Sequence, residues 1–107
     1  MMLTDLITGL SAIMPTTYGA WGTGNAKPLP YLIVFDTGPD DFYADDAHYL
    51  KRGTYRVEFY FEQKDPTVET QIESFFDADE IDWACDGDVY IETDKMFERI
   101  YYIEKGE

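Results

Sequence analysis

The sequence predicts an α+β domain with two helices on one face of a mostly antiparallel sheet. Three observations predict this class. Apolar residues near the N-terminus recur at helical spacing, residues 55–61 alternate with a period of two, and residues 65–76 return to helical spacing. We expect the order helix, strand, strand, helix and then two or three strands. With 107 residues, the chain is expected to form one domain, residues 1–107.

The first helix is predicted from an apolar stripe that Pro15 ends. The stripe consists of Leu3, Leu6, Ile7, Leu10, Ile13 and Met14. The following segment, residues 16–30, contains several glycines and prolines, which predicts an extended loop.

Two strands are expected next. Tyr31–Phe35 is a continuous apolar run bounded by Pro30 and Asp36, which is typical of a central strand that is covered on both faces. In residues 55–61, Tyr55, Val57, Phe59 and Phe61 alternate with polar residues and with Tyr60, which predicts one buried face and one solvent face.

The second helix is predicted to begin at Asp65-Pro66, because aspartate is a favoured N-cap and proline is tolerated in the first turn. Its apolar stripe is Val68, Ile72, Phe75 and Phe76. We expect the strand at 55–61 and this helix to pack together as the folding centre.

The C-terminal third is expected to contain only strands after a turn at residues 77–80. Ile81–Cys85 alternates as a short strand, and Asp86-Gly87-Asp88 predicts a tight turn. Val89–Thr93 and Met96–Glu104 are predicted as two further strands, with Asp94-Lys95 between them.

Charge and cysteine content exclude several functions. The 22 acidic and 8 basic residues give a formal charge of −14, which repels nucleic acid and anionic lipid. Cys85 is the only cysteine, so neither an internal disulfide nor a cysteine-based zinc site is expected. No apolar run approaches the ~20 residues of a membrane span. We expect a soluble cytoplasmic protein that needs no cofactor.

One motif resembles a catalytic one. An apolar strand leads into Asp36-Thr37-Gly38, as in retroviral-type aspartic proteases, where two aspartates share a proton. Such enzymes also need a glycine-rich flap, and no glycine occurs between Gly53 and Gly87. We therefore interpret the tripeptide as the exit of a strand.

Two other site types are conceivable. Asp36, Asp40, Asp41, Asp45 and Asp46 form an acidic cluster, but the glycine and glutamate spacing of a helix-flanked calcium loop is absent, so a solvated loop is favoured. His48 and Cys85 could form a base and a nucleophile, although Cys85 lies in an alternating strand typical of a structural thiol. We expect no metal site and no enzymatic activity.

The order of motifs over residues 28–104 is similar to that of a family of small tail proteins of long-tailed phages and prophages. The similarity lies in Leu29-Pro30-Tyr31, Phe42-Tyr43-Ala44-Asp45, Tyr49, Tyr55–Tyr60, Lys64-Asp65-Pro66, the helix residues Glu69, Ile72 and Glu73, Tyr90–Met96 and Ile100-Tyr101-Tyr102. This family resembles tail terminator or tail completion proteins, which act in head-tail joining. These motifs are structural, so they identify a family better than an activity.

The resemblance implies a tail-terminator-like fold and a ring of six copies that caps the tail tube. The implied partners are further copies of the chain, the major tail tube protein and the head-completion or connector protein. The implied location is the virion tail, with the host cytoplasm as the place of assembly. No catalytic residue is implied.

Phe42, Tyr43 and Tyr49 are candidates for a subunit interface, because aromatic residues in a polar, acidic segment fit burial against a neighbour. Packing in the core of the chain itself is the alternative for these three residues. Acidic residues lining a ring would repel passing DNA over about 8 Å at physiological salt. The alternative from the binding class is an acidic DNA mimic that occupies a host enzyme.

Overall fold

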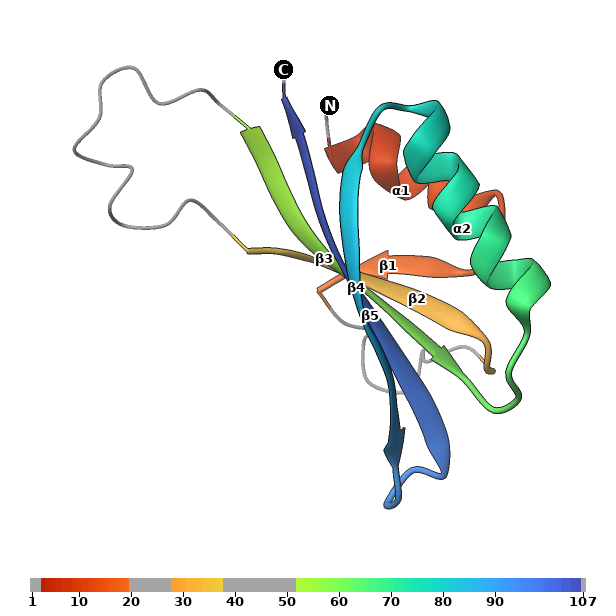
Figure 1. Cartoon of the computed structure of the whole chain (residues 1–107). Helices are drawn as coiled ribbons and strands as arrows, with labels where there is room; N and C mark the ends of the chain where they lie inside the picture. The colour runs from red at the N-terminus through yellow and green to blue at the C-terminus, as the bar shows by residue number, and fades with distance from the viewer. Residues whose placement is uncertain (1–2, 20–27, 38–51, 107) are drawn as a thin grey trace.

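The computed structural model describes residues 3–19, 28–37 and 52–106 and shows two helices packed against a five-stranded sheet (Figure 1). The helices are α1 (Leu3–Ser11) and α2 (Pro66–Ala78). The strands are β1 (Thr16–Tyr18), β2 (Tyr31–Asp36), β3 (Arg52–Phe61), β4 (Asp82–Ile91) and β5 (Met96–Gly106). The predicted α+β class is confirmed.

The strands lie in the order β1-β2-β3-β5-β4. β1 runs parallel to β2, and every other neighbouring pair is antiparallel. After β3 the chain therefore crosses through α2 to the edge strand β4 and returns as β5 between β3 and β4. β3 is the middle strand, and its ten residues pair with β5 from Arg52–Gly106 to Phe61–Phe97.

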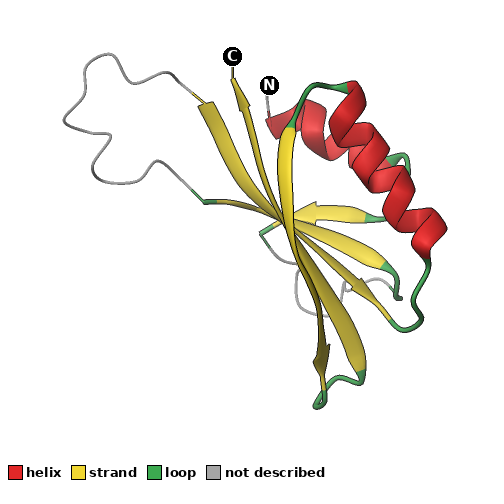
Figure 2. Ribbon diagram, viewed as in Figure 1, coloured by secondary structure: helices red, strands yellow, loops and turns green. Residues whose placement is uncertain are grey.

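Both helices lie on the same face of the sheet (Figure 2). The core lies between them and that face, which we call the helix side. Its buried apolar residues are Leu6, Leu10, Met14, Leu32, Val34, Val57, Phe59, Phe61, Ile72, Phe76, Ile81, Tyr101 and Ile103. Phe76 contacts Tyr101 edge to face at 5.5 Å, and Trp83 contacts Tyr101 in the same way at 5.7 Å.

We call the opposite side of the sheet the open face, because no helix of the described residues covers it (Figure 2). Alternation along the strands and their register decide which side chains lie there. Among them are Tyr31, Ile33 and Phe35 of β2, Arg56, Glu58 and Tyr60 of β3, Glu98, Ile100 and Tyr102 of β5, and Val89 and Ile91 of β4.

The predicted second helix is confirmed, including its start. Asp65 Oδ1 accepts hydrogen bonds from the backbone N–H groups of Thr67, at 3.1 Å, and Val68, at 3.3 Å. These bonds satisfy two of the amides that a helix leaves unpaired in its first turn. Ile72 and Phe76 are buried, and Val68 and Phe75 pack against the core, as the apolar stripe predicted.

The predictions for the first half of the chain need three corrections. The expected loop at 16–30 contains β1, which pairs with β2. In β2, Leu32 and Val34 are buried but Tyr31, Ile33 and Phe35 are only half-buried, so the strand is fully covered on one face alone. On the expected solvent face of β3, Glu58 is only 6% exposed, because the Arg56 guanidinium and the Tyr60 hydroxyl of the same strand lie against its carboxylate.

The tight turn predicted at Asp86-Gly87-Asp88 is wrong, because β4 runs without interruption from Asp82 to Ile91. Cys85 pairs with Tyr101 and Asp88 pairs with Arg99, so β4 has one extra residue and forms a β-bulge. Gly87 has φ of 90° in this bulge, a conformation that side chains disfavour. The residues that predicted a reversal of the chain therefore form a bulge within a continuous strand.

α1 and α2 approach closely at Gly9, where an added Cβ would overlap the Phe75 ring. Replacing a helical glycine with alanine normally stabilises by about 1 kcal/mol. Here we expect Gly9→Ala to destabilise by about 1 kcal/mol, because overpacking outweighs that gain. Denaturant unfolding of the variant checks this. In a Phe75→Leu background, which removes the two overlapping ring atoms, the same change should become neutral or stabilising, and an equal cost in both backgrounds would contradict the overlap.

Candidate functional site

Polar side chains gather at two places, one on each face of the sheet. The helix-side cluster lies between α2 and the β4–β5 hairpin and consists of Lys64, Glu69, Glu73, Asp88, Arg99 and Tyr101. The open-face cluster lies on β3 and β5 and consists of Arg56, Glu58, Tyr60 and Glu98.

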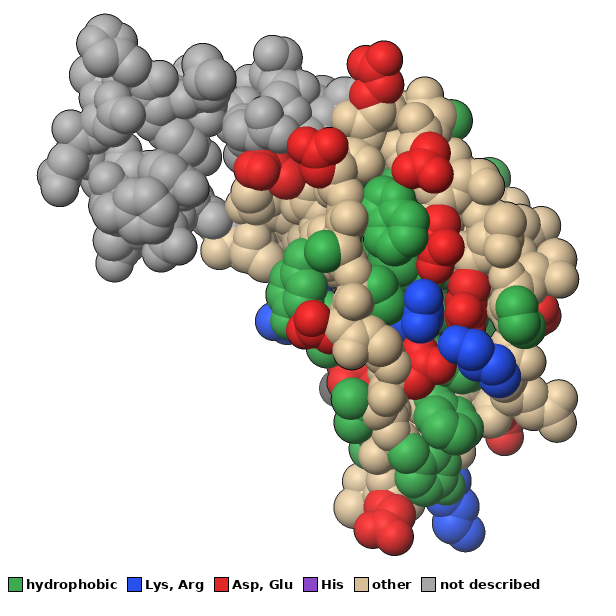
Figure 3. All heavy atoms as spheres, viewed as in Figure 1, with side chains coloured by type: hydrophobic (Ala, Val, Ile, Leu, Met, Phe, Trp, Pro, Cys, Tyr) green, Lys and Arg blue, Asp and Glu red, His purple; other side chains and the backbone are tan. Residues whose placement is uncertain are grey.

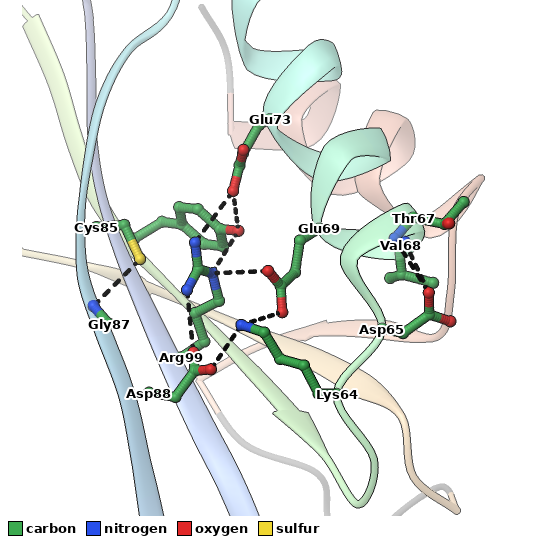
Figure 4. Close-up of polar contacts among 11 residues, drawn as sticks. Lys64, Asp65, Thr67, Val68, Glu69, Glu73, Cys85, Gly87, Asp88 and Arg99 are labelled. Atoms are coloured by element: carbon green, nitrogen blue, oxygen red, sulfur yellow. Dashed lines mark hydrogen bonds and ion pairs between the residues drawn. The ribbon is translucent and has the colours of Figure 1, made fainter.

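Arg99 is the centre of the helix-side cluster (Figure 4). Its guanidinium donates to Asp88 Oδ1 at 3.0 Å, to Glu73 Oε2 at 3.3 Å and to the Tyr101 hydroxyl oxygen at 2.8 Å. The Tyr101 hydroxyl in turn donates to Glu73 Oε2 at 2.7 Å. Burial and the hydrogen bond to Glu73 raise the pKa of Tyr101, although Arg99 opposes this, so the hydroxyl keeps its proton.

Lys64 closes the other side of the cluster. Its Nζ lies 2.7 Å from Asp88 Oδ2 and 2.7 Å from Glu69 Oε2. The contact with Glu69 is an ion pair without an aligned hydrogen bond. Glu69 is only 7% exposed, so its Oε2 is buried beside a positive charge but accepts no hydrogen bond. Burial alone would raise the pKa of Asp88, but hydrogen bonds from Lys64 and Arg99 outweigh it and hold that pKa below its ordinary value.

The bulge of β4 makes this cluster possible. In a regular strand, the residue opposite Arg99 would be Gly87, and Asp88 would point to the open face. The extra residue shifts Asp88 to the helix side, where it meets both cations. Since Tyr101 is fully buried and Glu69 nearly so, the cluster links α2 to the hairpin.

In the open-face cluster, the Tyr60 hydroxyl lies between two carboxylates. It is 2.6 Å from Glu58 Oε1 and 2.9 Å from Glu98 Oε2. Arg56 Nε lies 2.7 Å from Glu58 Oε2, and its guanidinium carbon lies 4.8 Å from the centre of the Phe35 ring. The Tyr31 ring contacts the Tyr60 ring at 5.3 Å, so aromatic side chains flank the charges.

One proton is missing from this arrangement if both carboxylates are ionised. A tyrosine hydroxyl donates a single hydrogen, so it can bond to Glu58 or Glu98 but not to both. Burial raises the pKa of the Tyr60 hydroxyl, and the two glutamates raise it further, so it does not ionise. Burial and the charge of Glu58 also raise the pKa of Glu98 above its usual range, against the opposing effect of Tyr60. A proton on Glu98 would supply the missing donor.

Exposed apolar side chains are concentrated on β4 and β5. Val89 is 57% exposed, Tyr90 is 50% exposed and Tyr102 is 43% exposed. Figure 3 shows hydrophobic side chains gathered over the lower part of the hairpin, below the charged groups of the helix-side cluster. On the helix side, the Tyr90 and Phe97 rings contact each other at 4.9 Å.

The structure places few of the site residues considered from the sequence. Phe42, Tyr43, Tyr49 and His48 lie outside the described residues, as do Asp40, Asp41, Asp45 and Asp46. Asp36 is exposed at the end of β2, opposite Tyr55 of β3. The span where a protease flap would be needed, residues 54–86, is described throughout and forms strand, helix and strand.

The remaining candidates are also located. Cys85 is half-buried as a free thiol, and its Sγ accepts the Gly87 N–H at 3.3 Å. Within residues 3–19, 28–37 and 52–106, no group of three or more His, Cys, Asp or Glu side chains is placed to hold a metal ion. In the same ranges, neither helix has the length and apolar character that crossing a bilayer requires.

Sequence reasoning missed both clusters, although one signal was present. Arg99 occupies an inward position of an alternating strand, between Phe97 and Tyr101. A charged residue at such a position needs partners, so it points to a buried ion-pair network. Nothing comparable marks Glu58 and Glu98, because their proximity depends on the pairing of β3 with β5.

We expect Arg99→Met to destabilise the protein by about 3 kcal/mol, because it leaves buried carboxylates without their main cation. Lys64→Met should cost less than about 1 kcal/mol, because the Lys64 side chain is 50% exposed and screened by water. Denaturant unfolding of both variants at neutral pH measures the difference. Equal effects would show that Arg99 does not hold α2 to the hairpin.

The open-face cluster predicts a pH dependence. Folding raises the pKa of Glu98. Such a carboxyl adds its full stability at pH values below the pKa that it has in the unfolded chain. This contribution is lost as the pH rises through the pKa that it has in the folded protein. Glu98→Gln should remove this loss, because the glutamine amide can donate a hydrogen bond to the Tyr60 hydroxyl oxygen at every pH. We expect it to stabilise by about 1 kcal/mol at pH 7 and to have no such advantage near pH 4.

Thermal or denaturant unfolding from pH 4 to 8 provides the measurement. Glu92→Gln is the matched control, because it removes one exposed carboxylate from the hairpin turn. A Glu98→Gln variant that is less stable than the natural chain at pH 7 would contradict a proton on Glu98.

No protein-family model, curated protein or solved structure matches this chain. The function of the two clusters and of the open face is therefore inferred from their own geometry.

Proposed function

We propose that this protein is a structural subunit of a phage or prophage tail, which forms a ring that ends the tail tube and joins the tail to the head. The observation that carries the assembly role is the open face. It has apolar and aromatic side chains on all four of its long strands, yet no helix of the described residues packs on it.

The composition of this face suits contact with another protein. Tyrosine and arginine are enriched at protein interfaces, and the open face carries three tyrosines and Arg56. Tyr102 is 43% exposed and Val89 is 57% exposed, while Ile33 and Ile100 are half-buried. A second copy of the chain, or a tail tube subunit, would remove these side chains from water.

The assignment to a tail comes from the resemblance of the motif order to tail terminator and tail completion proteins. A ring requires a heterologous contact, in which one surface of a copy meets a different surface of the next. The open face supplies one such surface. The sheet edge at β4 and the projecting end of the β4–β5 hairpin supply others (Figure 1).

The charge distribution favours assembly over DNA mimicry. A mimic presents rows of free carboxylates, but Glu58, Glu69, Glu73 and Asp88 are engaged by cations or hydroxyls inside the fold. The remaining negative charge fits a ring through which DNA passes without binding.

The test is electron microscopy of tails assembled without this protein, in the phage or prophage that encodes it. Overlong tubes would support tube termination, and tails of normal length without heads would support joining. Complementation then tests the interface. We expect Tyr102→Glu on the open face to fail and Thr70→Glu, the same charge placed on the exposed side of α2, to succeed.

Normal virions formed without the protein would overturn the tail assignment. Full complementation by Tyr102→Glu would show that the open face is not part of the interface. Circular dichroism of both purified variants separates an assembly defect from a folding defect.

A further inference from the structure

A cavity of about 300 Å³ lies where the start of α2 meets the end of β3 and the residues before β2. It is lined by Leu29, Pro30, Phe59, Phe61, Glu62, Gln63, Asp65 and Val68. This volume is at the small end of ligand sites, so it suits one side chain better than a large cofactor. Neither polar cluster contributes a residue to it.

The inner part of the cavity is apolar and rigid. Phe59 and Phe61 are 1% and 2% exposed, and their rings stack at 4.7 Å between centres. Both rings are held in the core, so the floor is formed before any ligand arrives. Leu29, Pro30 and Val68 complete apolar walls that would accept methylene groups.

The rim of the cavity is acidic. Glu62 and Asp65 are exposed, and Gln63 adds an amide between them in sequence. The two helix-capping bonds of Asp65 both go to Oδ1, which leaves Oδ2 for another donor. None of the eight lining residues is basic. Lys64 points away to Glu69 and Asp88, on the other side of the start of α2 (Figure 4).

We propose that this cavity binds the side chain of an arginine presented by a partner protein. The methylene stem of arginine matches the aromatic and aliphatic walls, and its flat guanidinium can donate to both rim carboxylates. Arginine is also less strongly hydrated than lysine, which suits a site with an apolar floor. The inference depends on the cavity alone and not on the assignment to a phage tail.

The test is an NMR titration of the full chain with N-acetyl-arginine amide. The control ligand is N-acetyl-citrulline amide, which has nearly the same shape but no charge. We expect arginine to shift the amide signals of Gln63 and Val68, with a dissociation constant on the order of 1 mM. Citrulline should bind at least about fivefold more weakly, because it lacks the charge that the rim attracts.

Two substitutions test the rim without disturbing the fold. Glu62→Gln and Asp65→Asn should each weaken arginine binding about threefold, and together about tenfold. Asparagine caps a helix as well as aspartate does, so Asp65→Asn keeps the start of α2. Glu80→Gln, which neutralises an exposed acid beyond the other end of α2, is the matched control and should leave binding unchanged.

Three results would overturn the proposal. Equal shifts with citrulline would show that the cavity does not recognise the charge. Arginine-induced shifts spread over the acidic surface, with none at Gln63 or Val68, would show binding by net charge alone. Unchanged affinity in the Glu62→Gln, Asp65→Asn double variant would show that the rim carboxylates are not the acceptors.

Discussion

The structure depends on the contact between α2 and the strands β4 and β5. Phe76 and Trp83 pack against the buried ring of Tyr101, and Trp83 Nε1 donates to Asp77 Oδ1 at the end of the helix. Next to this apolar contact, Arg99 joins carboxylates from α2 and β4. Burying a charge is costly unless it is paired, so the network holds only when helix and hairpin are both in place. This requirement couples the two C-terminal strands to the helix that precedes them.

Acidic residues close to the start of α2 have different surroundings. Glu69, Glu73 and Asp88 form ion pairs on the helix side with Lys64 and Arg99. Glu62 and Asp65, only a few residues away, remain exposed beside an apolar cavity. A large negative net charge alone would favour a diffuse repulsive field. The fold adds a local feature, because it places two of the exposed carboxylates next to an apolar cavity.

Local signals predicted the parts of the fold that local chemistry decides. The N-cap of Asp65, the helical stripe through Ile72 and Phe76, and the alternation through Val57 and Phe59 each involve neighbours within one turn or one strand. The region around Gly87 shows the limit of such signals. Asp86-Gly87-Asp88 favours a turn by composition, but pairing with β5 keeps the strand continuous and converts the extra residue into a bulge.

The sequence by itself determined the α+β class, the start of α2, the apolar helix side of β3 and the negative charge, because these depend on side-chain period, capping and composition. Tertiary structure alone decided the parallel pairing of β1, the position of β5 between β3 and β4, the contact of the Tyr60 hydroxyl with both Glu58 and Glu98, and the acid-rimmed cavity. Each of these joins residues far apart in the chain. These residues meet because of the strand register, which the packing of the whole core sets.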